Sequence, residues 1–297
     1  MYIIIFQEVV NNMGSVRVMS DSTCDLSPEL IGKHGISIVP LYVIFNGDSF
    51  RDGIDIKTDE LYKMVERMNT LPRTSAPSPS DFCKAFSDYI EKGEDIIYIG
   101  LSSEFSATVQ NARIAAQEFP EGRIEVIDSR NLSAGIGLLV MKAVDFAEQG
   151  LGISEIAENI KGLVPRVRTR FVINTLDYLY KGGRCTALES FFGGLLNIRP
   201  IIAVEEGRMI LEEKIRGKKE KALKCMLENA LADKGFIDSR RVFVTHSMAD
   251  EEAEYLKGVL EQKLEGPEII ITNAGCVISS HCGRGTAGIL YMKSSDA

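Results

Sequence analysis

Histidine is scarce in this chain, and the cysteines do not form close pairs. Of 297 residues only three are His and six are Cys, and no two cysteines make a C-x-x-C pair. Metal sites need Cys and His at short, repeated spacings, which the chain approaches only where His281 precedes Cys282. We therefore expect no metal site, and we expect reduced thiols rather than a disulfide framework.

Long apolar runs are also lacking. The N-terminal run, residues 2–6, is too short for a transmembrane helix, and no other run reaches the roughly 18 residues that a span needs. The start also lacks the basic residues and the small-residue cleavage site of a signal peptide. We expect a soluble, cytoplasmic protein, in which residues 1–12 are an extension that the fold does not need.

Positive charge is in deficit. The net charge of −8 argues against a broad nucleic-acid surface and against an anionic membrane patch, although a local basic patch is still possible. The hydrophobic fraction of 45% is enough for full cores, and the length favours two domains.

The chain has no common nucleotide or hydrolase motif. The stretch GLSSEFSAT, residues 100–108, lacks the glycine spacing and the lysine of a P-loop. No G-x-G-x-x-G follows a strand, and no G-x-S-x-G is present. These absences leave no support for a bound nucleotide cofactor or a nucleophile elbow.

The first half alternates strand-like and helix-like segments. Strands are predicted at 16–19, 95–102 and 123–129, of which 95–102 is expected to be buried. Helices are predicted at 58–68, with Thr58 as N-cap, and at 78–93, 108–119 and 135–150. This alternation predicts a parallel sheet with helices on both faces, a three-layer α/β/α domain.

The second half mixes a hairpin with helices. The run 199–217 predicts a β-hairpin that turns at Glu206-Gly207, followed by helices at 218–235 and 250–264. Strands are predicted at 240–247 and 268–275, and CVISSH, residues 276–281, is expected to be another extended piece. The pattern indicates an α+β domain with a mixed sheet. We place the domains at 13–164 and 165–297, with the boundary near Val164-Pro165.

Small hydroxyl residues gather where the predicted parallel strands end. The strand ends carry Asp21-Ser22-Thr23, Ser102-Ser103 and Asp128-Ser129, and nearby loops add Thr74, Ser75, Ser106 and Thr108. Ligands of open parallel sheets bind at this edge, where hydroxyls and free N–H groups at helix starts hold anions. The same residue types are common helix N-caps, so capping is the alternative for each of them.

The histidines and one arginine are the remaining candidates for a site. His34 at a helix end and His246 at a strand tip are expected to be structural. His281 is followed by Gly283 and Gly285, which permit positive φ and close approach of the backbone, so it is a candidate ligand-binding group. Arg184 follows Gly182-Gly183, which reads as a helix C-cap, and is a candidate for contact with an anion or a partner.

Eight motifs in order give the sequence a family resemblance. They are DSTCDL (21–26), TSAPSPSDF (74–82), LSSEFSATVQNA (101–112), VIDSRNLSAGIG (126–137), LDYLYKGGR (176–184), LLNIRPII (195–202), EEKIRGKKEKAL (212–223) and VISSHCGRGTAG (277–288). In this order they resemble the DegV family of bacterial fatty-acid-binding proteins, which includes the acyl-carrying subunit of fatty acid kinase. The resemblance covers residues 16 to 293.

The resemblance implies two α/β domains that clamp one long-chain fatty acid in a cleft between them. It implies a carrier without catalysis or cofactor, which presents the carboxylate to the ATP-binding subunit of fatty acid kinase for phosphorylation and touches the membrane only transiently for acyl exchange. The carboxylate-binding groups of the family match six residues here: Thr74, Ser75, Ser102, Ser103, Ser106 and His281. Three positions depart from the family pattern: Ala76 replaces a frequent Gln, Ala107 a frequent Gly, and Arg284 a common Pro.

Basic residues supply a hypothesis about the partner. Lys214, Arg216 and Lys218 are concentrated just before a predicted helix, where cations oppose the helix dipole. With Arg184 and Arg284, they are possible contacts for a kinase, and a solvated surface is the alternative.

Two other classes of function compete with the carrier. An enzyme, either a hydrolase or a protein like a kinase subunit, would use His281 as nucleophile or base, but the adjacent sequence offers no carboxylate to orient the imidazole. A purely structural or regulatory protein would have no stable internal cavity.

Overall fold

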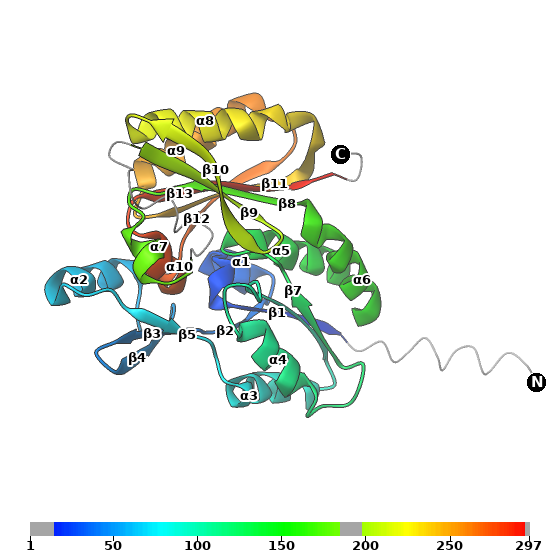
Figure 1. The fold of residues 1–297 in the computed structure, drawn as a ribbon. Coiled ribbons are helices and arrows are strands. Elements are labelled where there is room, and N and C mark those ends of the chain that lie inside the picture. The colour runs from blue at the N-terminus through cyan, green and yellow to red at the C-terminus, as the bar shows by residue number, and fades with distance from the viewer. Residues whose placement is uncertain (1–14, 185–197, 295–297) are drawn as a thin grey trace, which may run out of the picture.

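The computed structural model describes residues 15–184 and 198–294. Its first layer is a four-stranded sheet in the order β2-β1-β6-β7, in which all neighbouring strands are parallel (Figure 1). The predicted parallel sheet is therefore confirmed. Its strands are β1 (Val16–Asp21), β2 (Ser37–Val39), β6 (Asp95–Gly100) and β7 (Ile124–Asp128).

Helices cover both faces of this sheet, as the alternation predicted. On one face, Phe82 and Phe86 of α3 (Pro79–Ile90) pack with Tyr98 of β6, and α4 (Thr108–Ala116) lies beside α3. On the other face lie α5 (Ala134–Glu148) and α6 (Ile153–Leu163). Capping favours α3, because the side chains and backbone N–H groups of Ser78 and Asp81 form a reciprocal capping box.

The second large sheet has six strands in the order β10-β9-β8-β13-β11-β12. Only β11 and β12 are parallel, so the predicted mixed sheet is confirmed. The predicted hairpin joins β9 to β10 through Glu206 and Gly207, whose φ angles of 48° and 83° are those of a tight hairpin turn. The strands are β8 (Val167–Val172), β9 (Ile198–Glu205), β10 (Arg208–Arg216), β11 (Ile237–Ser247), β12 (Glu268–Asn273) and β13 (Thr286–Lys293).

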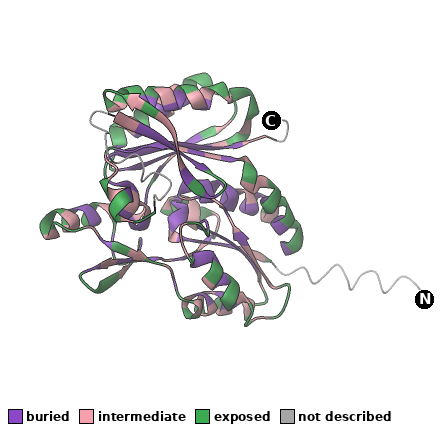
Figure 2. Ribbon diagram, viewed as in Figure 1, coloured by how far each residue is buried: buried purple, intermediate pink, exposed green. Residues whose placement is uncertain are grey.

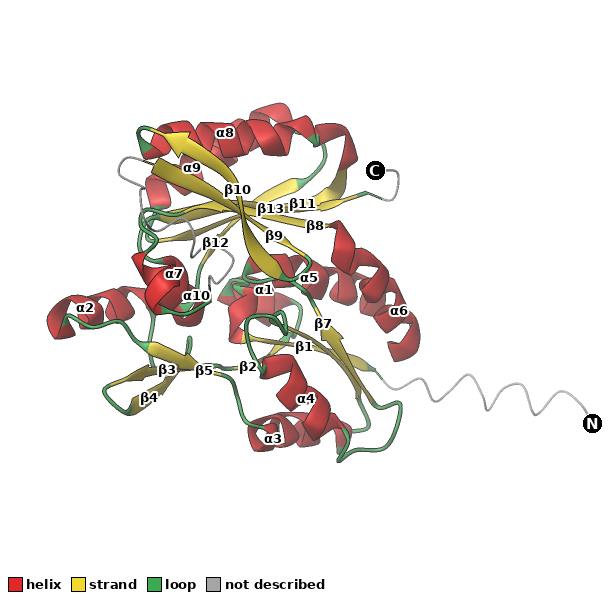
Figure 3. Cartoon of the chain, viewed as in Figure 1, coloured by secondary structure: helices red, strands yellow, loops and turns green. Residues whose placement is uncertain are grey.

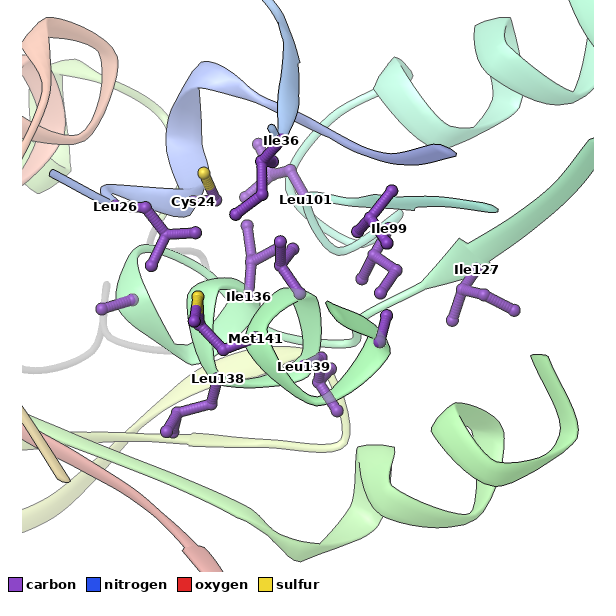
Figure 4. Packing of buried hydrophobic residues seen from close by; sticks show 14 of the residues in the cluster. Cys24, Leu26, Ile36, Ile99, Leu101, Ile127, Ile136, Leu138, Leu139 and Met141 are labelled. Carbon is purple, nitrogen blue, oxygen red and sulfur yellow. The ribbon is translucent and has the colours of Figure 1, made fainter. Parts of the chain in front are cut away.

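Helix α5 lies between the two large sheets. It contacts β1 and β6 on one side and β8, β11 and β13 on the other, and most of its residues are buried. Figure 4 shows Ile136, Leu138 and Met141 of α5 in one cluster with Cys24 and Leu101 of the first layer. The outer face of the six-stranded sheet is covered by α8 (Lys219–Ala232) and α9 (Asp250–Lys263) (Figure 3). Figure 2 shows this sheet as mostly buried and the outer side of α8 as exposed.

A third, small sheet was not predicted. It has the order β4-β3-β5 and is antiparallel, with strands β3 (Tyr42–Phe45), β4 (Asp48–Arg51) and β5 (Arg73–Ser75). Between β4 and β5 lies α2 (Thr58–Met68), whose N-cap is Lys57. The prediction of Thr58 as the N-cap is therefore wrong. Its hydroxyl donates instead to the carbonyl of Ala274 at 2.8 Å. The short elements η1 (Ser22–Cys24), α1 (Pro28–Lys33), η2 (Val164–Arg166) and η4 (Lys234–Phe236) complete the connections.

The stretch CVISSH, residues 276–281, is helical, so the prediction of an extended segment there is wrong. Residues Cys276–Cys282 form α10. Two buried carboxylates from distant loops accept its first N–H groups: Asp52 from Cys276 at 2.8 Å, and Asp25 from Gly275 at 2.8 Å. These tertiary hydrogen bonds favour a helix where β-branched and Ser residues favour it little on their own.

The predicted domain boundary falls in η2, just before β8. The largest hydrophobic cluster includes Ile136 and Leu139 before this point and Phe243, Leu290 and Met292 after it. The two halves therefore share a core, and the division into 13–164 and 165–297 stays a prediction. Within the described segments, no helix has both the length and the apolar character that crossing a bilayer requires.

Candidate functional site

A mostly apolar cavity lies where the three sheets meet α5 and α10. It contains about 880 Å³ of empty space, a figure that includes the part open to solvent. Its apolar lining is Leu41, Ala76, Leu101, Phe105, Leu132, Phe171, Leu179, Met209, Ala274, Val277, Ile278 and Leu290. This lining suits a ligand with an apolar part.

Polar side chains from two distant segments meet at one part of the lining. Thr74 lies on β5 and His281 on the last turn of α10, and their Oγ1 and Nε2 atoms are 2.9 Å apart. The other ring nitrogen, Nδ1, is buried and has no hydrogen-bond partner in the part of the chain that the structure describes. Neutral imidazole has one donor and one acceptor, so this buried nitrogen is left without a hydrogen bond.

The surroundings keep His281 neutral. Burial, and to a smaller degree the positive charge of Arg184, lower the pKa of His281 to about 4. Gly182, which follows α7 (Asp177–Lys181), packs directly on the ring, because a Cβ there would lie 2.3 Å from Nδ1. The ring is thus fixed between Thr74 on one side and the end of α7 on the other.

Ser75 and Ser106 also line the cavity. The Ser75 hydroxyl donates to the carbonyl of Ala76 at 3.2 Å, and the Ser106 hydroxyl is 2.7 Å from that of Thr108. Both are local contacts that a hydroxyl can exchange for a ligand without breaking a long-range link. Four of the six residues predicted to bind the carboxylate are therefore together in the cavity lining.

Ser102 and Ser103 are not among the lining residues. The buried hydroxyl of Ser102 donates to the carbonyl of Gly207 at 2.9 Å and so ties the first layer to the β9–β10 turn. Ser103 is exposed, and its hydroxyl donates to Asp128 at 2.6 Å. Their backbone follows β6 as expected, but their side chains turn to other parts of the protein.

Arg184 is the one Lys or Arg among the residues described as lining the cavity. Its Nη1 donates to the carbonyl of Gly182 at 2.8 Å, and the side chain is exposed. Lys214, Arg216 and Lys218 are exposed on β10 and at the start of α8, outside the lining. Arg284 is also exposed and forms an ion pair with Glu66 at 3.6 Å.

The glycines after His281 mainly serve chain packing. Gly283 and Gly285 have φ angles of 77° and 84°, and a Cβ on them would press on Tyr178 and Asn174 at 2.9 and 2.2 Å. Neither glycine lines the cavity, whereas Gly288 does. We expected these two glycines to let the backbone approach a ligand. In the structure, glycine is needed there because the backbone has positive φ and packs closely against other parts of the protein.

Several polar lining residues were missed from the sequence. They are Ser133, Thr169, Thr245, Ser247 and Thr286. His246 lines the cavity too, but its Nδ1 accepts the N–H of Ala249 at 3.1 Å, the structural role that was expected, and burial lowers its pKa. Alternation along β8, β11 and β13 was the available signal, but it does not tell which face meets a cavity. Among the described residues, no three His, Cys, Asp or Glu side chains are grouped to hold a metal ion.

Sequence comparison identifies the class of protein. The model described as an uncharacterised protein of the DegV family matches residues 15–294, and the chain belongs to this family. A DegV domain-containing protein of Caldanaerobacter subterraneus subsp. tengcongensis is 36% identical over 279 residues, which are 94% of this chain and 99% of that protein.

Solved structures of the family have the same fold. The DegV family protein of Thermus thermophilus, described as binding fatty acid, is 33% identical with a TM-score of 0.87, over 94% of this chain and 99% of that one. A stearic-acid-binding protein of Eubacterium ventriosum is 28% identical, with a TM-score of 0.86 over 95% and 99% of the two chains. DegV of Bacillus subtilis, described as a fatty acid binding protein, is 28% identical, with a TM-score of 0.85 over 95% and 100%.

Proposed function

We propose that this protein binds one long-chain fatty acid in the cavity, with the carboxylate at Thr74, Ser75, Ser106 and His281. The observation that carries the proposal is the mostly apolar cavity whose polar part brings Thr74 and His281 together. Fatty acid binding by relatives of the same fold supports it.

The apolar chain supplies most of the binding free energy. Burying about 14 methylenes of a palmitoyl chain is worth at most about 11 kcal/mol, at about 0.8 kcal/mol each. Only modest polar stabilisation is then needed at the carboxylate. Hydroxyls and one neutral histidine can supply it, with the exposed Arg184 adding a favourable charge at the cavity edge.

The protonation state of His281 suits a donor rather than a general base. A pKa of about 4 leaves the ring neutral near pH 7, with one N–H to donate. In the described part of the chain, Nε2 contacts a hydroxyl and Nδ1 has no partner, so no carboxylate orients the ring as a catalytic base requires. This supports a carrier over the hydrolase or kinase-like enzyme.

We further propose that the carrier presents the carboxylate to the ATP-binding subunit of a fatty acid kinase. Arg184 at the cavity edge and the exposed residues Lys214, Arg216, Lys218 and Arg284 are the proposed contacts. The proposed site also draws on both sides of the predicted boundary, with Thr74 from the first half and His281 from the second, as expected if domains 13–164 and 165–297 hold the ligand between them.

The test is to identify and then titrate the ligand. Native mass spectrometry of the purified protein should show one added fatty acid per chain. After delipidation, palmitate and oleate should bind, and hexadecanol, which has the same chain as palmitate but no carboxylate, should bind more weakly. A bare polypeptide that binds neither acid would refute the proposal, and equal affinity for hexadecanol would remove the polar residues from it.

A further inference from the structure

Two polar side chains, Thr169 and Asn131, separate this cavity from a second one; they are called the wall below. A second cavity, of about 1160 Å³ in the same measure, lies at the start of β8 and beside β9. It is lined mainly by polar and charged side chains, including Arg130, Arg168, Arg170, Glu205, Glu206 and Glu212. Thr169 lines both cavities, and its hydrogen-bond partner Asn131 lines the second.

The wall is well fixed. Thr169 and Asn131 are each only 3% exposed, and the Thr169 hydroxyl donates to Oδ1 of Asn131 at 2.8 Å. That oxygen also accepts the N–H of Leu132 at 3.0 Å, and the carbonyl of Asn131 accepts the N–H of Ser102 at 2.9 Å. Gly135 packs against the same oxygen, since a Cβ at this position would lie 2.2 Å from it.

The strand register puts this wall at the far end from His281. In the β8–β13 pair, Thr169 lies opposite Leu290 and Phe171 opposite Gly288, and all four line the first cavity. His281 precedes β13, and the Thr286 hydroxyl donates to the carbonyl of Cys282 at 2.9 Å, so His281 lies near the Thr286 end of the lining and beyond Gly288. Each step of two residues adds about 7 Å, so the cavity runs along the strands from His281 towards Thr169.

We propose that the Thr169–Asn131 pair is the stop for the methyl end of the acyl chain and sets the longest chain that binds well. The inference rests on the proposed fatty acid binding. A longer chain must break a buried hydrogen bond between two fixed side chains, and the methylenes that pass would enter a cavity with charged walls. Methylenes there gain little hydrophobic stabilisation, so affinity stops rising with length.

Three substitutions at one position test the stop. Thr169→Ala opens the wall, Thr169→Leu thickens it, and Thr169→Val keeps the shape of the side chain while removing the hydroxyl. Kd is measured for laurate, myristate, palmitate, stearate, arachidate and behenate with delipidated protein. The melting temperature of each variant is measured alongside, so that loss of folding is recognised.

We expect wild-type affinity to rise up to one chain length and then level off or fall. This limit should move to longer acids in Thr169→Ala, with up to about fourfold tighter binding for each further methylene buried. It should move less in Thr169→Val, which keeps the shape of the side chain but not its hydrogen bond, and should move to shorter acids in Thr169→Leu. Superimposable length profiles for wild type and Thr169→Ala, both binding palmitate, would overturn the stop but not the proposed function. A wild type that binds none of the acids would overturn both.

Discussion

Thr74 and His281 are 207 positions apart in the sequence, and their side chains are 2.9 Å apart in the structure. Each comes from a short element that depends on the rest of the fold. Thr74 lies on the three-residue strand β5, and His281 lies in the last turn of the seven-residue helix α10. The site is therefore assembled by tertiary structure and is present only in the folded protein.

Removing either side chain should weaken fatty acid binding. Loss of a hydrogen bond to a charged group costs about 1.5–3 kcal/mol, so His281→Ala should raise Kd for palmitate roughly 10- to 150-fold. Thr74→Val should have a smaller effect, and the double variant should cost less than the sum, because the two groups contact each other. His34→Ala is the matched control, since His34 contacts Glu148 away from the cavity. Unchanged affinity in His281→Ala, with the fold intact, would exclude His281 from the site.

The stability of the unliganded protein should depend on pH through His281. Its pKa in the fold, about 4, is below the ordinary value of 6.5, so the folded state favours the neutral ring. The stabilisation is complete above pH 6.5 and is lost as the pH falls towards 4, by up to about 3 kcal/mol. Urea unfolding of delipidated wild type and His281→Gln should diverge over this window. Parallel curves from pH 7 to pH 4 would contradict the prediction.

The ion pair between Asp145 and Arg241 should contribute to stability. Asp145 of α5 accepts two hydrogen bonds, at 2.8 and 2.9 Å, from Arg241 of β11. Burial alone would raise the pKa of Asp145, but the hydrogen bonds from Arg241 and Arg240 outweigh the effect of burial, and the pKa is lowered. Asp145→Ala should reduce the free energy of unfolding by about 3 kcal/mol, because it leaves partly buried positive charge unpaired. Asp59→Ala, which removes the exposed pair with Lys63, is the control and should cost less than about 0.5 kcal/mol.

The basic residues should affect the partner and not the ligand. The double variant Arg216→Ala with Lys218→Ala should load palmitate normally, because neither residue lines the cavity. With the cognate kinase and ATP, it should form less acyl phosphate than wild type. Lys224→Ala with Lys257→Ala removes the same charge from one exposed and one half-buried helix position and serves as control. Normal phosphorylation in the first variant would assign these residues to the solvated surface, and loss of loading would assign them to the cavity.

Many strands of the two large sheets were predictable because they are strongly apolar, but β13 was not predicted. Runs such as residues 96–100 and 242–244 are buried, and the helices between strands have clear periodicity and caps. The small sheet was not predictable, because β5 has only three residues and no visible alternation. Helix α10 was missed because Val277 and Ile278 favour strands, while the carboxylates that stabilise the helix, Asp25 and Asp52, are more than 200 positions away.

The candidate site was predictable by residue type but only partly by geometry. Thr74, Ser75, Ser106 and His281 line the cavity as the family resemblance implied, while Ser102 and Ser103 do not. A strand end fixes where the backbone of a hydroxyl residue lies, but the loop conformation decides where its side chain points. The unpaired Nδ1 of His281 results from Gly182 and Thr74 on its two sides, and no local pattern reveals that contact.

Because α5 is packed between two sheets, it belongs to the interior of both. Ile136 and Met141 pack with residues of the first layer, while Lys142 and Asp145 pair with Asp238 and Arg241 of the second. Separating the layers would expose one face of this helix to water whichever half kept it. The chain is thus expected to lose its structure in a single cooperative transition. A fragment ending at Val164 would carry an uncovered apolar helix face and tend to associate with itself.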